Sequence, residues 1–179
     1  MSGEENYRLY LDGDDEGLVS IIKEFRDPLT LYLAGVAGSF SLAEEYAEET
    51  FFILAAKRPR FNGKSSFKTW LYAIAKNTAM KAMKKVSREV ALTEDKTAEE
   101  NLEDAVISDE RRRTVRRALD RVADDYREAL YLVYIEQMSN GDAAKVMKKS
   151  KRQIENLLYR ARSALRRELE KEGFTYEDL

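Results

Sequence analysis

Two residue types are missing from the 179-residue chain, which contains neither cysteine nor histidine. Without cysteine there can be no disulfide, no thiolate metal site and no cysteine nucleophile. Without histidine the chain lacks the commonest general base and the commonest ligand of transition metals. We therefore expect neither an enzyme nor a protein that carries a cofactor or metal ion.

Long apolar runs are missing as well. No segment approaches the roughly 20 uninterrupted apolar residues of a membrane-spanning helix, and the acidic opening "MSGEENYRLYLDGDDEG" does not resemble a signal peptide. Hydrophobic residues still make up 44% of the chain, enough for a packed core. These features predict a cytoplasmic protein that does not insert into a membrane.

Proline is scarce, and the spacing of apolar residues is helical nearly throughout, without an alternating strand pattern. Pro28 suits the first turn of a helix, and Pro59 would end one. The polar, acidic segment 87–107 predicts a linker. We expect an all-α fold of two small helical domains, 1–86 and 108–172, with a tail over 173–179. The predicted helices cover 14–25, 28–37, 42–57, 66–86, 108–122, 124–137, 139–147 and 151–171.

The net charge of −2 conceals blocks of opposite sign. Residues 1–56 carry 12 acidic and 3 basic residues, whereas residues 57–88 carry 10 basic residues and no acidic one. Residues 89–110 are acidic again, with 9 acids and 1 base, and residues 139–172 hold 10 bases and 5 acids. Scatter of charge over solvated helix faces would rarely leave so long a window without an acid. The pattern predicts two surfaces for a polyanion.

Four glutamates share one arc of the helix predicted over 42–57, apart from its apolar stripe. Like charges four residues apart repel each other by about 0.2–0.5 kcal/mol per pair in an isolated helix. An N-terminal acidic turn would explain the cluster through the helix dipole, and a docking face for a basic protein surface would explain it equally well. A catalytic or metal-binding cluster is disfavoured because no histidine accompanies it. The four residues are Glu44, Glu45, Glu48 and Glu49.

The run Gly63-Lys64-Ser65 resembles part of a nucleotide-binding P-loop, but position 58, where the first glycine of that motif belongs, is Arg58. The preceding segment is also a predicted helix and not a strand. Instead, Asn62-Gly63 predicts a turn, after which Ser65 or Ser66 caps a basic helix.

In that basic helix Phe67, Leu71, Ile74 and Thr78 form the predicted buried stripe. Lys68, Tyr72 and Lys76 share another face, where a tyrosine between two lysines could stack on unpaired bases. Alternatively, Tyr72 packs at the domain boundary against a lysine stem. The pattern leaves open whether Trp70 belongs to the core or contacts a base. A membrane surface is a further partner for such a helix, but the capped turn and the second basic block argue against it.

The segment 139–165 predicts a helix-turn-helix. Ala143 and Ala144 are small where two helices would cross, and Ser150 would cap the second helix. The core side of that helix carries Ile154, Leu157, Leu158, Ala161 and Leu165; Arg152, Asn156, Tyr159 and Ser163 face the other way. Base edges would be contacted by Arg152, Gln153 and Asn156, and phosphates by Lys148, Lys149, Lys151, Arg160 and Arg162. An ordinary helical hairpin with a charged outer face is the alternative.

Both modules together resemble the extracytoplasmic-function (ECF) subfamily of bacterial RNA polymerase sigma factors. Residues 25–79, from "FRDPLTLYL" to "WLYAIAKNTA", resemble sigma region 2, and residues 119–169, from "LDRVADDYREAL" to "YRARSALRREL", resemble sigma region 4. The chain departs from the subfamily at Lys148, usually glycine, and at Lys149, usually apolar. Gly141 lies within the first helix of the motif, and Val122-Ala123 replaces the usual Leu-Pro.

The resemblance implies a sigma factor that binds core RNA polymerase and promoter DNA and is controlled by an anti-sigma factor. The acidic helix would dock on the polymerase, although Glu45 and Glu48 stand where the subfamily usually has Asp and Gln. The helix over 151–163 would bind the −35 element as duplex. The single-stranded −10 element would be recognised and melted by Asn62, Lys64, Ser65, Lys68, Trp70, Tyr72, Lys76 and Asn77.

Two other functions compete with this expectation. A helix-turn-helix regulator would bind duplex DNA tightly and would not associate with core polymerase. An enzyme acting on nucleic acid lacks a plausible catalytic constellation in the sequence.

Overall fold

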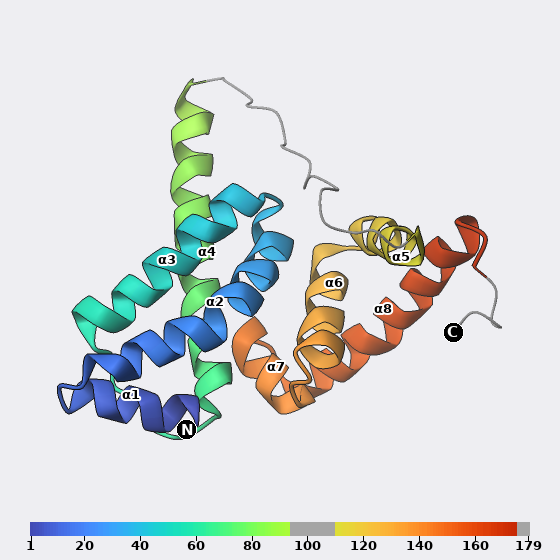
Figure 1. Cartoon of the computed structure of the whole chain (residues 1–179). Helices are drawn as coiled ribbons and strands as arrows, with labels where there is room; N and C mark the ends of the chain where they lie inside the picture. Colours follow the sequence, from blue (N-terminus) through green and yellow to red (C-terminus); the bar gives the residue numbers. More distant parts are fainter. Residues whose placement is uncertain (94–109, 175–179) are drawn as a thin grey trace. The chain divides into compact units, whose positions relative to one another are not determined.

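The structure is a computed structural model that describes residues 1–93 and 110–174, with the side chains of 89–93 and 110–112 left out. The chain forms two compact helical units (Figure 1). The first contains α1 (Gly3–Leu11), α2 (Asp15–Ala37), α3 (Phe40–Lys57) and α4 (Phe67–Thr93). The second contains α5 (Glu110–Asp120), α6 (Asp124–Leu130), the π-helical turn η1 (Tyr131–Ile135), α7 (Asn140–Met147) and α8 (Lys151–Lys171). The described ranges hold no strand, and the predicted all-α fold of two small domains is confirmed.

Helix α1 is absent from the prediction, which treated this acidic segment only as a non-signal sequence. It begins with a capping box: the Glu5 amide donates to the Ser2 hydroxyl, and the Ser2 amide donates to the Glu5 carboxylate. Tyr7 and Tyr10 lie one turn apart and are buried. The Ser-x-x-Glu pattern and the spacing of the tyrosines are the signals that could have revealed this helix.

The prediction of two helices separated at Pro28 is wrong, because α2 runs without a break from Asp15 to Ala37. Proline has no N–H and therefore cannot complete the helical bond to the carbonyl four residues earlier. Phe25 and Leu29 on either side of Pro28 are buried, which indicates that packing of the whole helix outweighs this local cost. Gly38 then ends α2 in the left-handed conformation, with φ 71°.

Helices α2, α3 and α4 enclose the core of the first unit around fully buried Ile21, Leu33, Leu54 and Leu71. Helix α4 extends beyond the predicted end at residue 86, so the beginning of the predicted linker over 87–107 is helical. Residues 94–107 of that linker and 175–179 of the predicted tail lie outside the described residues. None of the helices in the described residues is long and apolar enough to cross a membrane.

In the second unit α8 is the longest helix and packs against α5, α6 and α7. The predicted helix over 124–137 occurs as α6 and η1, and its last turn carries a π-type bond from the Glu136 amide to the Tyr131 carbonyl. Ion pairs connect Arg117 of α5 and Arg121, just beyond the end of α5, to Glu172 beyond the end of α8, at 3.3 and 2.5 Å. These ion pairs connect the C-terminal end of α5 to the C-terminal end of α8.

Helices α1 and α2 approach so closely at Gly17 that no side chain fits between them. A Cβ atom on Gly17 would lie 2.2 Å from the Asn6 carbonyl oxygen and 2.8 Å from the Tyr10 amide nitrogen. We expect Gly17→Ala to lower the free energy of unfolding by about 1–3 kcal/mol, the usual cost of overpacking a tight site. Chemical denaturation of the full chain measures the change.

Gly35→Ala provides the matched control, since Gly35 lies in the same helix and a Cβ atom added to it would meet nothing within 4 Å. Alanine there should stabilise α2 by about 0.5–1 kcal/mol, because glycine is the poorer helix former. Equal effects of the two substitutions would contradict the close contact at Gly17.

Candidate docking face and nucleic-acid interface

The acidic face of α3 consists of Glu44, Glu45, Glu48 and Glu49, all exposed. Ser39 caps α3 by accepting a bond from the Leu42 amide, so the helix begins earlier than predicted and its first turn contains no acid. The helix dipole, which acts mainly in the first turn, therefore does not account for the cluster. Among the described residues the four glutamates form no ion pair.

A pocket between α2 and α3 adjoins this acidic face. Its lining includes Ile22, Ala47 and Phe51 together with Arg26, and Glu44 and Glu48 form part of the same wall. The face therefore offers a partner apolar surface and charge of both signs. Such a combination suits recognition of a protein surface better than coordination of a metal ion.

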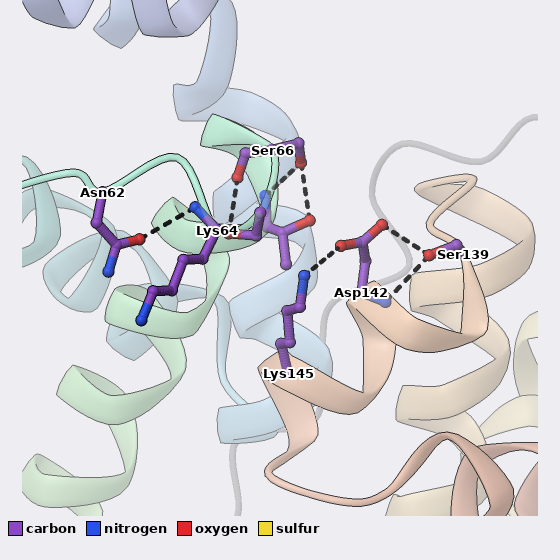
Figure 2. Close-up of polar contacts among 8 residues, drawn as sticks. Asn62, Lys64, Ser66, Ser139, Asp142 and Lys145 are labelled. Carbon is purple, nitrogen blue, oxygen red and sulfur yellow. Dashed lines mark hydrogen bonds and ion pairs between the residues drawn. The ribbon is translucent and has the colours of Figure 1, made fainter.

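The loop between α3 and α4 takes the predicted turn. Gly63 is left-handed, with φ 69°, and the Lys64 amide donates to the Asn62 side-chain oxygen at 3.1 Å. Ser66 is the residue that caps α4: its hydroxyl accepts from the Thr69 amide at 3.1 Å (Figure 2). Ser65 bonds instead to the Ser66 carbonyl. Lys64 and the Asn62 side chain are thereby presented at an exposed bend.

Tyr72 does not form the predicted exposed stacking platform, and that prediction is corrected. Its ring is fully buried and lies 5.1 Å from the Tyr32 ring, centroid to centroid. The true buried stripe of α4 has a strict four-residue spacing through Phe67, Leu71, Ala75 and Ala79, and Tyr72 flanks it. Ile74 and Thr78, predicted for the stripe, are only partly buried.

The acid-free segment 57–88, called the basic window below, provides positive charge, but Tyr72 does not provide a stacking surface within it. Lys68, Lys76 and Asn77 are partly buried, and the Lys68 ammonium lies 5.7 Å from the centre of the Tyr72 ring. The exposed cations begin at the end of α3 and continue along α4: Lys57, Arg58, Arg60, Lys64, Lys81, Lys84, Lys85 and Arg88. A polyanion that approaches this part of the first unit is attracted by these cations, and residues 57–88 contribute no acidic side chain that would repel it.

Trp70 is partly buried in an aromatic cluster with three other rings. Its ring centroid lies 5.3 Å from Tyr7, 5.2 Å from Phe61 and 5.5 Å from Phe67. Of the two roles that the sequence left open, this position favours the core.

The predicted helix-turn-helix is present as α7, the turn at 148–150 and α8. Ala143 and Ala144 are buried, and Ser139 caps α7 through the Asp142 amide (Figure 2). Ser150 caps α8 in a capping box, in which the Gln153 side-chain oxygen accepts from the Ser150 amide at 2.7 Å. Gln153, predicted to contact bases, is therefore turned back over the start of its own helix.

The two lysines of the turn differ in position. Lys148 is exposed and adopts the left-handed conformation, with φ 54° and ψ 44°, for which glycine is better suited. Lys149 is partly buried, and its ammonium forms an ion pair with Asp125 of α6 at 3.0 Å. Lys149 thus has a partner inside the unit, whereas the predicted role assigned it to a phosphate.

The residues predicted to face away from the core on α8 are exposed in the structure. Arg152, Asn156, Arg160 and Ser163 are exposed, and so is 70% of Tyr159. Ile154, Leu158 and Ala161 are buried, whereas Leu157 and Leu165 are only partly buried. Lys151 is exposed near Glu155, at 4.0 Å. Side chains suited to base edges and phosphates therefore occupy one side of the helix.

The sequence missed the residues that brace the loop before α4. The hydroxyl of Tyr7 donates to the Pro59 carbonyl at 2.7 Å, and that of Tyr10 donates to the Ala55 carbonyl at 2.9 Å. Burial raises the pKa of Tyr7 to about 12, so this hydroxyl stays a protonated donor even at pH values where an exposed tyrosine ionises. The Arg58 guanidinium lies 4.8 Å above the Tyr10 ring.

Comparison with known families places each unit. Residues 21–89 match Sigma-70 region 2, and residues 112–165 match Sigma-70 region 4. The two units together therefore define a member of the sigma-70 class of transcription initiation proteins. Sigma factors recognise DNA for RNA polymerase and are not themselves enzymes.

Similarity to individual proteins narrows the class. The chain is 32% identical to the RNA polymerase sigma-H factor of Pseudomonas aeruginosa over 142 residues, which cover 72% of this chain and 73% of that protein. It is 27% identical to the ECF RNA polymerase sigma factor SigW of Bacillus subtilis over 170 residues, 88% and 91% of the two chains. The sigma factor RpoE, solved in complex with the anti-sigma factor NepR from Bartonella quintana, is 26% identical, with a TM-score of 0.69 over 79% of this chain and 89% of that chain. The chain belongs to the ECF sigma factors of the sigma-70 family.

The left-handed conformation of Lys148 leads to a stability prediction. A side chain in that conformation costs roughly 1–2 kcal/mol relative to glycine. We expect Lys148→Gly to raise the free energy of unfolding of the second unit by about 1 kcal/mol, measured by denaturation of the full chain. Lys148→Ala removes the same charge and keeps the strain, so an equal gain from alanine would contradict the backbone explanation.

Proposed function

We propose that this ECF sigma factor docks on core RNA polymerase through the acidic face of α3 and binds the two promoter elements with separate units. The loop over 58–66 and α4 recognise and melt the −10 element, and the helix-turn-helix binds the −35 element as duplex. The observation that carries the proposal is the change of charge at Lys57. Exposed glutamates occupy α3, and the residues that follow form an acid-free basic window.

The residues proposed to bind the −10 element are Asn62, Lys64, Ser65, Lys68, Lys76 and Asn77, without Tyr72, which is buried, and Trp70, which packs in the aromatic cluster. Exposed lysines bind the phosphate backbone, which draws the strand to the first unit. Asn62 and Lys64 then lie at the bend where an unpaired base can approach. For the −35 element Arg152 and Asn156 contact base edges, and Lys148, Lys151 and Arg160 contact phosphates.

We also infer control by an anti-sigma protein, since the structural relative RpoE was solved in complex with one. The acidic face of α3 and its adjoining pocket would be a competing site for such a protein. A regulator that covers this face would prevent docking on the polymerase without touching DNA.

The alternative of a helix-turn-helix regulator without core polymerase uses only the second unit. It leaves the acidic face and the basic window of the first unit without a role. In vitro transcription with core polymerase separates the two functions. If the chain binds duplex DNA tightly alone and neither binds core nor directs initiation at any promoter, the proposal is wrong.

Charge reversal tests the docking face. The triple substitution of Glu45, Glu48 and Glu49 by lysine should abolish binding to core polymerase, because three attractive contacts become repulsive. Helicity by circular dichroism should be nearly unchanged, since all three residues are exposed. Core affinity is measured with a fluorescently labelled chain.

Lysine substitution of three other exposed acids in the first unit, Asp12, Asp15 and Glu24, gives a control with the same change in net charge. This control should bind core polymerase like the unaltered chain. Equal loss of binding in both triple variants would point to net charge and would remove the assignment of the α3 face.

Arg152 tests base recognition by α8. Arg152→Ala should weaken binding to the preferred −35 sequence by about 1–3 kcal/mol if the guanidinium makes a bidentate base contact. Promoters altered one base at a time, bound by the polymerase complex, measure this. A uniform loss on every sequence would instead identify Arg152 as a phosphate contact, as we expect for Arg160→Ala.

A further inference from the structure

The last turn of α3 contains a backbone carbonyl for which the helix itself provides no partner. The Ala55 carbonyl belongs to the last turn of α3, where carbonyls have no partner within the helix, and the residue four positions later is Pro59, which has no N–H to offer. The Tyr10 hydroxyl donates to the Ala55 carbonyl instead, at 2.9 Å. Tyr7 donates to a second carbonyl, that of Pro59 just beyond the end of α3, at 2.7 Å.

The same two tyrosines also hold the side chains around this exit from α3. Tyr7 contacts Phe67 and Trp70 at ring centroid distances of 5.6 and 5.3 Å, and Phe61 of the loop joins the cluster through Trp70 at 5.2 Å. The Arg58 guanidinium lies over the Tyr10 ring and donates to the Tyr10 hydroxyl at 3.4 Å. The loop is therefore attached to α1 at its backbone and at its aromatic side chain.

The backbone of Arg58 adds to this observation, because Arg58 is one of three non-glycine residues with positive φ in the described part of the chain, at 43°. A residue in that conformation persists where its surroundings determine it, and such sites tend to be functional. Here the surroundings are the Tyr10 ring and the two hydroxyl bonds. If the tyrosines served only to fill the core, phenylalanine would do so equally well, and the hydroxyls would have no role.

We propose that Tyr7 and Tyr10 of α1 are positioning residues, which hold the segment 58–66 in the conformation that discriminates the −10 bases. This inference rests on the proposed function, which assigns that segment to the −10 element. Neither tyrosine touches DNA in this scheme. Each tyrosine acts through its hydrogen bond to a backbone carbonyl, and together the two bonds fix the conformation of the loop.

Tyr7→Phe and Tyr10→Phe test the proposal, because each removes one hydroxyl and keeps the ring. Trp70 is the only tryptophan of the chain and lies in the cluster, so its fluorescence and its quenching by acrylamide report on the loop directly. The second readout is −10 selectivity in the complete polymerase complex. A promoter is first selected from a random library with the unaltered chain, and open-complex yield is then compared between it and its single-base −10 variants.

Each variant should lower the ratio of open-complex yields by about 2- to 10-fold, the equivalent of one net hydrogen bond, and the double variant by more. Acrylamide should quench Trp70 more strongly in the Tyr7 variant. The affinity for core polymerase should stay unchanged, because the acidic face of α3 is not part of the brace, by which we mean the Tyr7 and Tyr10 hydrogen bonds. A merely structural role would lower yields on all promoters by one factor and leave the ratio intact.

Two controls separate the brace from general destabilisation. Ile21→Val shortens a fully buried side chain of α2 and should lower the melting temperature without changing the selectivity ratio or Trp70 quenching. Tyr126→Phe removes a hydroxyl from α6 in the second unit and should alter neither. Unchanged −10 selectivity in both brace variants overturns the inference. If the unaltered chain itself shows no core binding and no −10 selectivity, it is the proposed function that fails.

Discussion

Separation of opposite charge within one small unit is the constraint on which the rest of the structure depends. The glutamates of α3 repel one another along their helix, and the lysines and arginines that follow repel one another in turn. Each set would be more stable if it were mixed with the other. A functional surface that needs one sign of charge must therefore be held by something other than local electrostatics, and here that is the core of α2, α3 and α4.

Several tyrosines are buried in the core that holds this separation, and they serve in two ways. Tyr32 and Tyr72 pack against each other between helices. Tyr7 and Tyr10 add hydrogen bonds to backbone that lacks a helical partner. In the second unit Ser139 and Ser150 bond the free amides at the beginnings of α7 and α8. The Lys149–Asp125 ion pair additionally anchors the turn of its helix-turn-helix.

Periodicity and capping predicted the helices and both modules from sequence, because these depend on local spacing. Ser150 and the outer face of α8 were predicted for the same reason. The errors arose where distant residues decide the outcome. Pro28 lies inside a helix because packing outweighs one missing bond, and Tyr72 is buried although its neighbours at i±4 are lysines. Gln153 is held by its hydrogen bond to Ser150, and the sequence does contain this capping pattern, a serine three residues before a glutamine. Helix α1 was not predicted, because the segment is acidic overall and its buried face has only two large apolar residues, Tyr7 and Tyr10.

The two hydrogen bonds from α1 to the end of α3 also have a consequence for the order of folding. The carbonyls of Ala55 and Pro59 are satisfied by residues 45 and 52 positions earlier in the chain. On the ribosome α1 is made first, yet its hydroxyls gain their partners only after the whole of α3 and the proline have emerged. The loop before α4 therefore cannot reach its final conformation by local folding. It reaches that conformation only when α1 has packed against the end of α3.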